Sequence, residues 1–122
     1  MKKLASLLVL LLAGITLYGQ AIVGTWEGSF TAPTPDGGEA TLKVVFHIES
    51  TDDGFSSTLD SPDQGAFGLE TTGTTFENKE LVVKKDDLDF VYTGKLIDDK
   101  NIEGGFLQMG MEFDMNLVKK EE

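Results

Sequence analysis

An all-β, antiparallel barrel is the fold class that the sequence predicts, and three observations predict it. From residue 22 onward apolar and polar residues alternate with a period of two, turn-forming residues recur about every ten positions, and no stretch keeps a helical period over three turns. Each strand then has one apolar face, and closure into a barrel hides those faces and removes both open edges. We therefore expect an up-and-down meander of about eight strands closed into a small barrel. A two-sheet sandwich uses the same alternation and is the alternative.

The first two strands carry the clearest alternation. The first is expected at 22–31 and the second at 40–49, separated by a Pro- and Gly-rich loop at 33–38, and Asp-Asp-Gly at 52–54 turns the chain after them. The residues expected to point inward are Ile22, Gly24, Trp26, Gly28, Phe30, Leu42, Val44, Phe46 and Ile48. His47 falls on the opposite face, which is the outside of a closed barrel.

The later strands are shorter. We expect strands at 55–59 and 66–71, joined by a polar loop at 60–65, and one or two more around Phe76, Leu81 and Val83 with a turn at 77–79. The apolar residues that mark the next strand are Leu88, Phe90, Tyr92 and Leu96. A turn at 98–101 leads to strands at 102–109 and 111–118. The last strand is expected to direct inward Met111, Phe113, Met115 and Leu117.

The first 21 residues are predicted to be a secretory signal peptide. A Met-Lys-Lys start precedes an apolar stretch at 4–17 that is too short to span a bilayer comfortably. Small residues at Gly19 and Ala21 suit a signal peptidase that cuts before Ile22, with a cut after Gly19 as the alternative. An uncleaved N-terminal anchor is the competing interpretation. We therefore expect a secreted or periplasmic protein with one domain at 22–122.

Composition excludes several function classes. The 122 residues include no cysteine and no arginine, which excludes disulfides, thiol nucleophiles, thiolate metal sites and bidentate phosphate clamps. Two of the ten lysines lie in the signal peptide, so without it the formal net charge falls from −11 to −13. Such a polyanion gains no counterion release on nucleic acid and is repelled by anionic membrane surfaces. We expect a soluble monomer without a membrane span once the signal peptide is removed.

Two resemblances rest on particular motifs. The segment Gly24-Thr-Trp26 resembles the Gly-x-Trp signature of lipocalin-like and avidin-like barrels, in which the tryptophan plugs one end of the barrel beneath an arginine from the last strand. A longer set of motifs comprises Gly24-Thr-Trp-Glu-Gly28, Val45-Phe-His-Ile48, Leu59-Asp-Ser-Pro-Asp-Gln-Gly-Ala66, Tyr92-Thr-Gly94 and Ile102-Glu-Gly-Gly-Phe-Leu-Gln108. This set is similar to a small lipocalin-like β-module of secreted bacterial proteins of the Bacteroidetes type.

The second resemblance implies an association with hydrolases. The module often precedes an alpha/beta-hydrolase (serine hydrolase) domain and sometimes stands alone after a signal peptide. This sequence contains no Gly-x-Ser-x-Gly nucleophile motif, so no catalytic residue is carried over. The resemblance implies an accessory module that docks onto a separate secreted hydrolase.

Inward-facing residues give the first candidate site. A mostly aromatic interior with a few polar members can hold a small apolar ligand, although a filled core needs the same residues. The candidate ligand-binding residues are Trp26, Phe46, Tyr92, Phe106, Gln108 and Met115.

The polar loop gives the second candidate site, for a partner. Its residues are Asp60, Ser61, Pro62, Asp63, Gln64 and Gly65. Asp side chains accept backbone N–H bonds and proline fixes a turn, so the same residues also suit a well-ordered loop.

The only histidine, His47, has no serine and carboxylate at a spacing typical of a triad. The aspartate pairs at 52–53, 86–87 and 98–99 lack calcium-loop spacing. We expect a binding module without catalytic residues, metal or cofactor.

Overall fold

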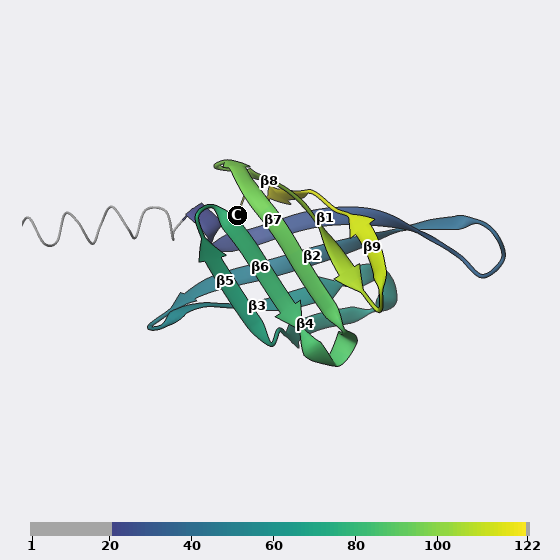
Figure 1. Cartoon of the computed structure of the whole chain (residues 1–122), viewed down its shortest axis with the longest axis horizontal. Helices are drawn as coiled ribbons and strands as arrows, with labels where there is room; N and C mark the ends of the chain where they lie inside the picture. The colour runs from purple at the N-terminus through teal and green to yellow at the C-terminus, as the bar shows by residue number, and fades with distance from the viewer. Residues whose placement is uncertain (1–20, 122) are drawn as a thin grey trace, which may run out of the picture.

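The computed structural model describes residues 21–121, and they form a closed antiparallel barrel (Figure 1). Eight strands close the ring in the order β1, β2, β3, β5, β6, β7, β8 and β10, which pairs back with β1. The strands are β1 (Gly24–Pro33), β2 (Glu39–Thr51), β3 (Gly54–Ser61), β4 (Ala66–Glu70), β5 (Gly73–Glu77), β6 (Glu80–Lys85), β7 (Phe90–Asp98), β8 (Asn101–Gln108), β9 (Met111–Asp114) and β10 (Leu117–Lys119). The prediction of an all-β barrel with about eight strands is confirmed.

Two strands, β4 and β9, lie outside the ring, so the predicted up-and-down meander is wrong at these two places. β4 pairs only with β3, so the strand expected at 66–71 is a branch and β5 takes the next place in the ring. The strand expected at 111–118 breaks at Met115 and Asn116. β9 pairs with the last part of β8, whereas β10 bridges the first part of β8 and β1. The break lets one short segment close the barrel.

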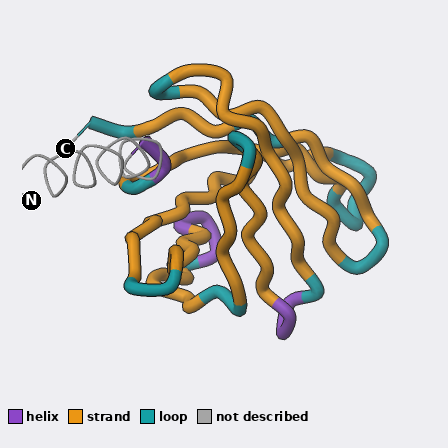
Figure 2. The backbone as a smooth tube through the Cα atoms, turned by 60° about the vertical axis from the view of Figure 1, so that its left-hand side comes forward, coloured by secondary structure: helices purple, strands orange, loops and turns teal. Residues whose placement is uncertain are grey.

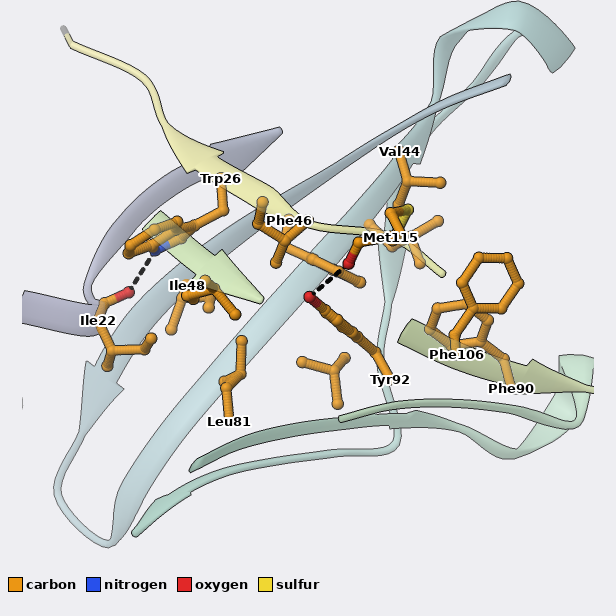
Figure 3. Close-up of a cluster of buried hydrophobic side chains, with 14 of the residues drawn as sticks. Ile22, Trp26, Val44, Phe46, Ile48, Leu81, Phe90, Tyr92, Phe106 and Met115 are labelled. Carbon is orange, nitrogen blue, oxygen red and sulfur yellow. Dashed lines mark hydrogen bonds between the residues drawn. The ribbon is translucent and has the colours of Figure 1, made fainter. Parts of the chain in front are cut away.

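The core follows the alternation of the first strands. Register pairs Trp26 with Phe46 and Phe46 with Leu59, so these three side chains form one row across the inner face of β1, β2 and β3. Figure 3 shows the side chains of Trp26, Phe46, Leu81 and Tyr92 meeting inside the barrel. Burial of such large apolar side chains supplies most of the stability of a domain of this size.

The barrel has two distinct ends. Antiparallel pairing brings together, at one end, the β1–β2 hairpin, the 3₁₀ turn η1 (Pro62–Gln64), the 3₁₀ turn η2 (Asp86–Leu88) and the β8–β9 turn. We call this the helical-turn end; it lies at the lower right of Figure 1. The opposite end, the Trp26 end, carries the start of β1, the β2–β3, β5–β6 and β7–β8 turns, and β10. The backbone tube in Figure 2 shows the long strands running between them.

Four local expectations differ from the structure because strands end earlier or later than the alternation suggests. Ile22 is buried, but it belongs to a helical turn before β1. Asp60 and Ser61 belong to β3, so the loop proper begins at Pro62. Leu88 lies in η2 and is 39% exposed, and Met111 is 50% exposed at the start of β9. In both cases a turn interrupts the pattern that would direct the side chain inward.

The predicted signal peptide lies almost wholly outside the described residues. In the part that the structure describes, no helix has the length and apolar character needed to cross a membrane.

Candidate functional site

Five of the six interior candidates lie together in the core. Trp26, Phe46 and Tyr92 are 0% exposed, Met115 is 1% and Phe106 is 2%. Phe46 stacks on Tyr92 with ring centroids 5.5 Å apart. The rings therefore fill the space around one another at this level of the barrel.

The polar group among these residues already has a partner. The Tyr92 hydroxyl donates a hydrogen bond of 2.8 Å to the carbonyl oxygen of Met115, as the dashed line in Figure 3 shows. Burial raises the pKa of the Tyr92 phenol, so it stays protonated and remains a donor. Tyr92 thus ties β7 to the chain between β9 and β10.

Gln108 lies apart from the other five. Its side-chain amide nitrogen donates a hydrogen bond of 3.2 Å to the carbonyl oxygen of Leu88, so it joins β8 to η2 at the helical-turn end. The residue shares the alternation of Phe106, but the strand ends there and places it at the rim. The structure therefore divides the predicted ligand site into a packed interior and a rim residue.

The loop at 60–65 is held by its own polar side chains. Asp60 accepts a hydrogen bond of 2.7 Å from the backbone N–H of Gly68, and Asp63 accepts one of 2.8 Å from the backbone N–H of Lys43. Ser61 donates to Gln64 at 2.6 Å, and Pro62 starts the 3₁₀ turn. Gly65 ends the turn with φ of 68°, a value that favours glycine.

One of these bonds satisfies a backbone N–H group of β2 that has no partner on β3. β3 pairs with β2 only from Val45 onward, so Lys43 lies beyond the last paired residue. The Asp63 carboxylate takes the place of a strand partner for the Lys43 N–H. Both carboxylates of the loop therefore stabilise its conformation, and the side chains left facing outward include Gln64.

His47 lies beside this loop on the outer face of β2. Its Nε2–H donates to the Asp60 carboxylate at 2.7 Å, and its Nδ1 lies 3.2 Å from the hydroxyl of Thr25. Partial burial alone would raise the pKa of Asp60. The hydrogen bonds from Gly68 and His47 outweigh this effect and lower the pKa below its ordinary value. The imidazole is thereby fixed in one orientation, with a side chain that is 43% exposed.

A polar groove of about 440 Å³ adjoins His47. Its lining residues are His47, Glu49, Ser56, Ser57, Thr58, Glu70 and Thr71.

Strand register explains why the sequence did not reveal the His47–Asp60 pair. The two residues are 13 positions apart and meet only because β2 and β3 pair.

The helical-turn end carries exposed apolar side chains that the sequence analysis did not select. Phe67 is 65% exposed at the start of β4, Met109 is 77% exposed at the β8–β9 turn, and Leu107 and Met111 beside that turn are each 50% exposed. Leu88 of η2 belongs to the same end, because the Met109 N–H bonds the carbonyl oxygen of Asp89. We call Phe67, Leu88, Leu107, Met109 and Met111 the apolar rim.

The backbone at Met109 is unusual for a methionine. Gln108 pairs with Met111, which leaves a two-residue turn in which Met109 has φ of 51° and Gly110 has φ of 81°. Turns of this kind favour Asn-Gly, because a long side chain at positive φ is strained. The sequence signal that could have revealed this turn was the Met-Gly pair between two alternating segments.

The apolar rim lies among carboxylates. The exposed acidic residues at this end include Asp63, Asp86, Asp87, Asp89 and Glu112. Two lysines lie at the end of β6: Lys84 is exposed, whereas Lys85 is 7% exposed and binds the carbonyl oxygen of Glu70 at 2.8 Å and Asp87 at 3.1 Å. The helical-turn end therefore presents apolar side chains inside a negative field.

Comparisons with family models, with curated proteins and with solved structures find no match for this chain. Among residues 21–121, no group of three or more His, Cys, Asp or Glu side chains is placed to hold a metal ion. The fold defines the class of protein, which is a small antiparallel β-barrel with eight strands in the ring and two extra strands.

Proposed function

We propose that the protein is a non-enzymatic binding module that docks onto a protein partner through its helical-turn end. The observation that carries the proposal is the exposure of two side chains at this end: Phe67, 65% exposed near the start of β4, and Met109, 77% exposed on the β8–β9 turn. Large apolar side chains that are ringed by polar residues are typical of protein interfaces, where they act as anchors. The loop at 60–65 supports the surface, because one hydrogen bond within it and two to the backbone N–H groups of Lys43 and Gly68 hold it against the sheet.

We favour the end of the barrel over its interior as the binding site. A small apolar ligand at the level of Phe46 would have to displace rings that stack on each other. Movement of Tyr92 would also leave the carbonyl oxygen of Met115 without its hydrogen bond, and an unpaired buried carbonyl is destabilising.

The charge of this end suggests the chemistry of the partner. Carboxylates outnumber lysines around the apolar rim, and Lys85 is already paired with Asp87, so a partner surface with an apolar pocket flanked by lysine or arginine would be complementary. The same charge disfavours anionic membranes and nucleic acid. Together with the predicted export, the resemblance to hydrolase-associated modules supports a separate secreted hydrolase as the partner.

Site-specific photocrosslinking tests this proposal. Phe67 in one variant, and Met109 in another, is replaced by a photoreactive phenylalanine analogue. Each variant is produced in the organism that naturally makes the protein. Ile97 and Val118 provide matched controls, because they are apolar, 54% and 50% exposed, and belong to strand segments at the Trp26 end. We expect one protein to be captured at both test positions and at neither control position, with a yield that falls as salt increases.

Two outcomes would contradict the proposal. Equal capture at the test and control positions would show that exposure alone governs the reaction. Absence of any adduct at Phe67 and Met109, when a reagent control confirms an active crosslinker, would remove the docking function from this end.

A further inference from the structure

The β1–β2 hairpin continues past the strands that flank it. β10 pairs with β1 only as far as Gly28, and β3 pairs with β2 only from Val45 onward. In the described part of the chain, residues 29–33 and 39–44 therefore pair with each other and with no third strand. We call these two segments and the turn between them the arm, which extends beyond the barrel at the right of Figure 1.

The outer edge of the arm on β2 carries free backbone groups. The N–H of Lys43 points away from β1, because it donates to the Asp63 carboxylate at 2.8 Å. Backbone groups alternate in direction along a strand, so the N–H and C=O groups of Thr41 and Glu39 also point away from β1. Among residues 21–121, the backbone groups of Thr41 have no hydrogen-bond partner. An open edge of this kind is a template for another strand.

The sequence of this edge is complementary to itself. If two copies pair antiparallel about Thr41, this residue lies opposite its own equivalent, and the two exchange both backbone hydrogen bonds. Glu39 of each copy then lies opposite Lys43 of the other, and both side chains are exposed on the outer face. On the other face, Ala40 lies opposite Leu42 of the second copy. Opposite charges and apolar side chains in directly opposed positions each stabilise such a pair.

The charged groups near this edge are able to serve the pairing. Lys43 pairs with Glu27 at 3.2 Å, but Glu27 also pairs with Lys120 at 3.6 Å, so Glu27 keeps a partner when Lys43 turns to a second copy. Glu39 has no ion pair with any described residue. Because Asp63 already binds the N–H of Lys43, the ladder between two copies is short.

The opposite edge of the arm, on β1, is less suitable for this pairing. Pro33 has no N–H group to donate. Residues 29–33 contain no charged side chain, so two copies would form no ion pair there. Phe30 packs against Phe113 of β9 with ring centroids 5.2 Å apart, so β9 lies beside the start of this edge.

We propose that two copies of this protein associate through the β2 edges of their arms, antiparallel and centred on Thr41. This departs from the monomer that the net charge predicts. Repulsion between the two negative chains is screened over about 8 Å at physiological salt, whereas the opposed charges of the edge are in contact. The dimer is weak, because only residues 39–43 of each copy pair. The arm shares no residue with the apolar rim, so the inference does not depend on the docking function.

Charge reversal tests this register. Each protein is produced from the full chain in an exporting bacterial host, and sedimentation equilibrium at about 0.15 M salt follows the dimer up to about 1 mM protein. We expect the dimer fraction of wild type to rise with concentration. Glu39→Lys alone and Lys43→Glu alone each place like charges opposite each other at both ends, and each should weaken the dimer by about tenfold or more.

The two variants should nevertheless associate with each other. Glu39→Lys has lysine at both positions and Lys43→Glu has glutamate at both, so a mixture opposes unlike charges at both ends. A fluorophore on one variant reports the mixed dimer. The double variant E39K/K43E is the matched control, since it keeps the net charge of wild type and should dimerise as wild type does.

A second pair of variants tests which edge is used. Thr41→Pro removes the central N–H of the β2 edge and should abolish the dimer, whereas Thr31→Pro removes an N–H of the β1 edge and should leave it intact. Thermal unfolding establishes that each variant is folded. Wild type that stays monomeric throughout, single charge variants that do not associate when mixed, or a dimer lost with Thr31→Pro but not with Thr41→Pro would each overturn the proposal.

Discussion

The Lys119 ammonium lies over the indole ring of Trp26, with Nζ 5.7 Å from the ring centroid. Register places the two residues opposite each other on β10 and β1, the pair of strands that closes the barrel. The last strand therefore supplies the cation that covers this tryptophan. The ammonium also donates to the carbonyl oxygen of Ala21, so one side chain joins three segments of the Trp26 end.

Replacement of Lys119 should therefore weaken the closed barrel. We expect Lys119→Met to lower the free energy of unfolding by about 1 kcal/mol, through loss of the cation–π contact and of one hydrogen bond. Urea denaturation followed by the fluorescence of the only tryptophan, Trp26, measures this change. Lys120→Met is the control, because it breaks only a solvent-exposed ion pair and should change stability by less than about 0.5 kcal/mol. Equal losses for the two variants would refute the role of the contact.

Removal of a single buried hydroxyl tests the link between β7 and the chain after β9. Tyr92→Phe leaves the Met115 carbonyl oxygen without its donor, and we expect a loss of about 1–3 kcal/mol in the free energy of unfolding. Met115→Leu keeps that carbonyl and should cost less than about 1.5 kcal/mol. Thermal and urea unfolding of both variants provide the comparison, and a neutral Tyr92→Phe would contradict the assigned hydrogen bond.

The Asp60 carboxylate should make stability depend on pH. Its pKa is lowered in the folded protein, so its stabilising effect is present above the ordinary aspartate value of about 3.9 and is lost as the pH falls through the lowered pKa. We expect Asp60→Ala to cost about 1–3 kcal/mol near neutral pH, and the difference from wild type to shrink below about pH 4. Asp53→Ala, at an exposed turn residue, is the control for a change of charge alone. A difference that stays constant from neutral to acid pH would contradict this prediction.

Two glycines with different surroundings offer a matched pair. A Cβ at Gly104 would lie 2.3 Å from the carbonyl oxygen of Thr93 and 2.5 Å from the Cα of Gly94, whereas a Cβ at Gly73 would meet no atom within 4 Å. We expect Gly104→Ala to cost about 3 kcal/mol or more, because backbone atoms must move. Gly73→Ala should be neutral or stabilising by up to about 1 kcal/mol, since it restricts the unfolded chain. Thermal unfolding measures both variants, and we expect a lower melting temperature than wild type for Gly104→Ala but not for Gly73→Ala.

Met109 should show opposite effects on stability and on binding. Asparagine tolerates the positive φ of this position better than methionine, so we expect Met109→Asn to stabilise the fold by about 0.5–1 kcal/mol. Because the substitution removes the most exposed side chain of the apolar rim, it should also reduce partner capture by a crosslinker at Phe67. A variant that is both more stable and fully competent in capture would indicate that the methionine has no binding role.

The sequence predicted the parts of the fold that depend on local alternation. The period of two assigned the inner faces of β1 and β2 correctly, including Trp26 and Phe46, because each strand residue reverses direction. It misplaced Leu88 and Met111, because each lies next to a turn where the alternation is interrupted.

Contacts between distant strands could not be predicted in the same way. The bonds from Asp63 to Lys43 and from His47 to Asp60 depend on how far β2 extends past β3, which is a property of register. The exposed rim likewise results from which turns meet at one end of the ring.

The closing strand has a consequence for how the molecule forms. β10 contributes only three residues to the pairing that joins β1 to β8. Trp26 of β1 pairs across this closure with Lys119, a residue 93 positions later in the chain. Pairing across so long a separation is slow, because the entropy of the intervening loop is lost before the contacts form. A chain that emerges N-terminus first would expose the edge of β1 until almost all of it had been delivered. Folding of this barrel should therefore end with ring closure, and the open intermediate is the species most exposed to proteases and to aggregation.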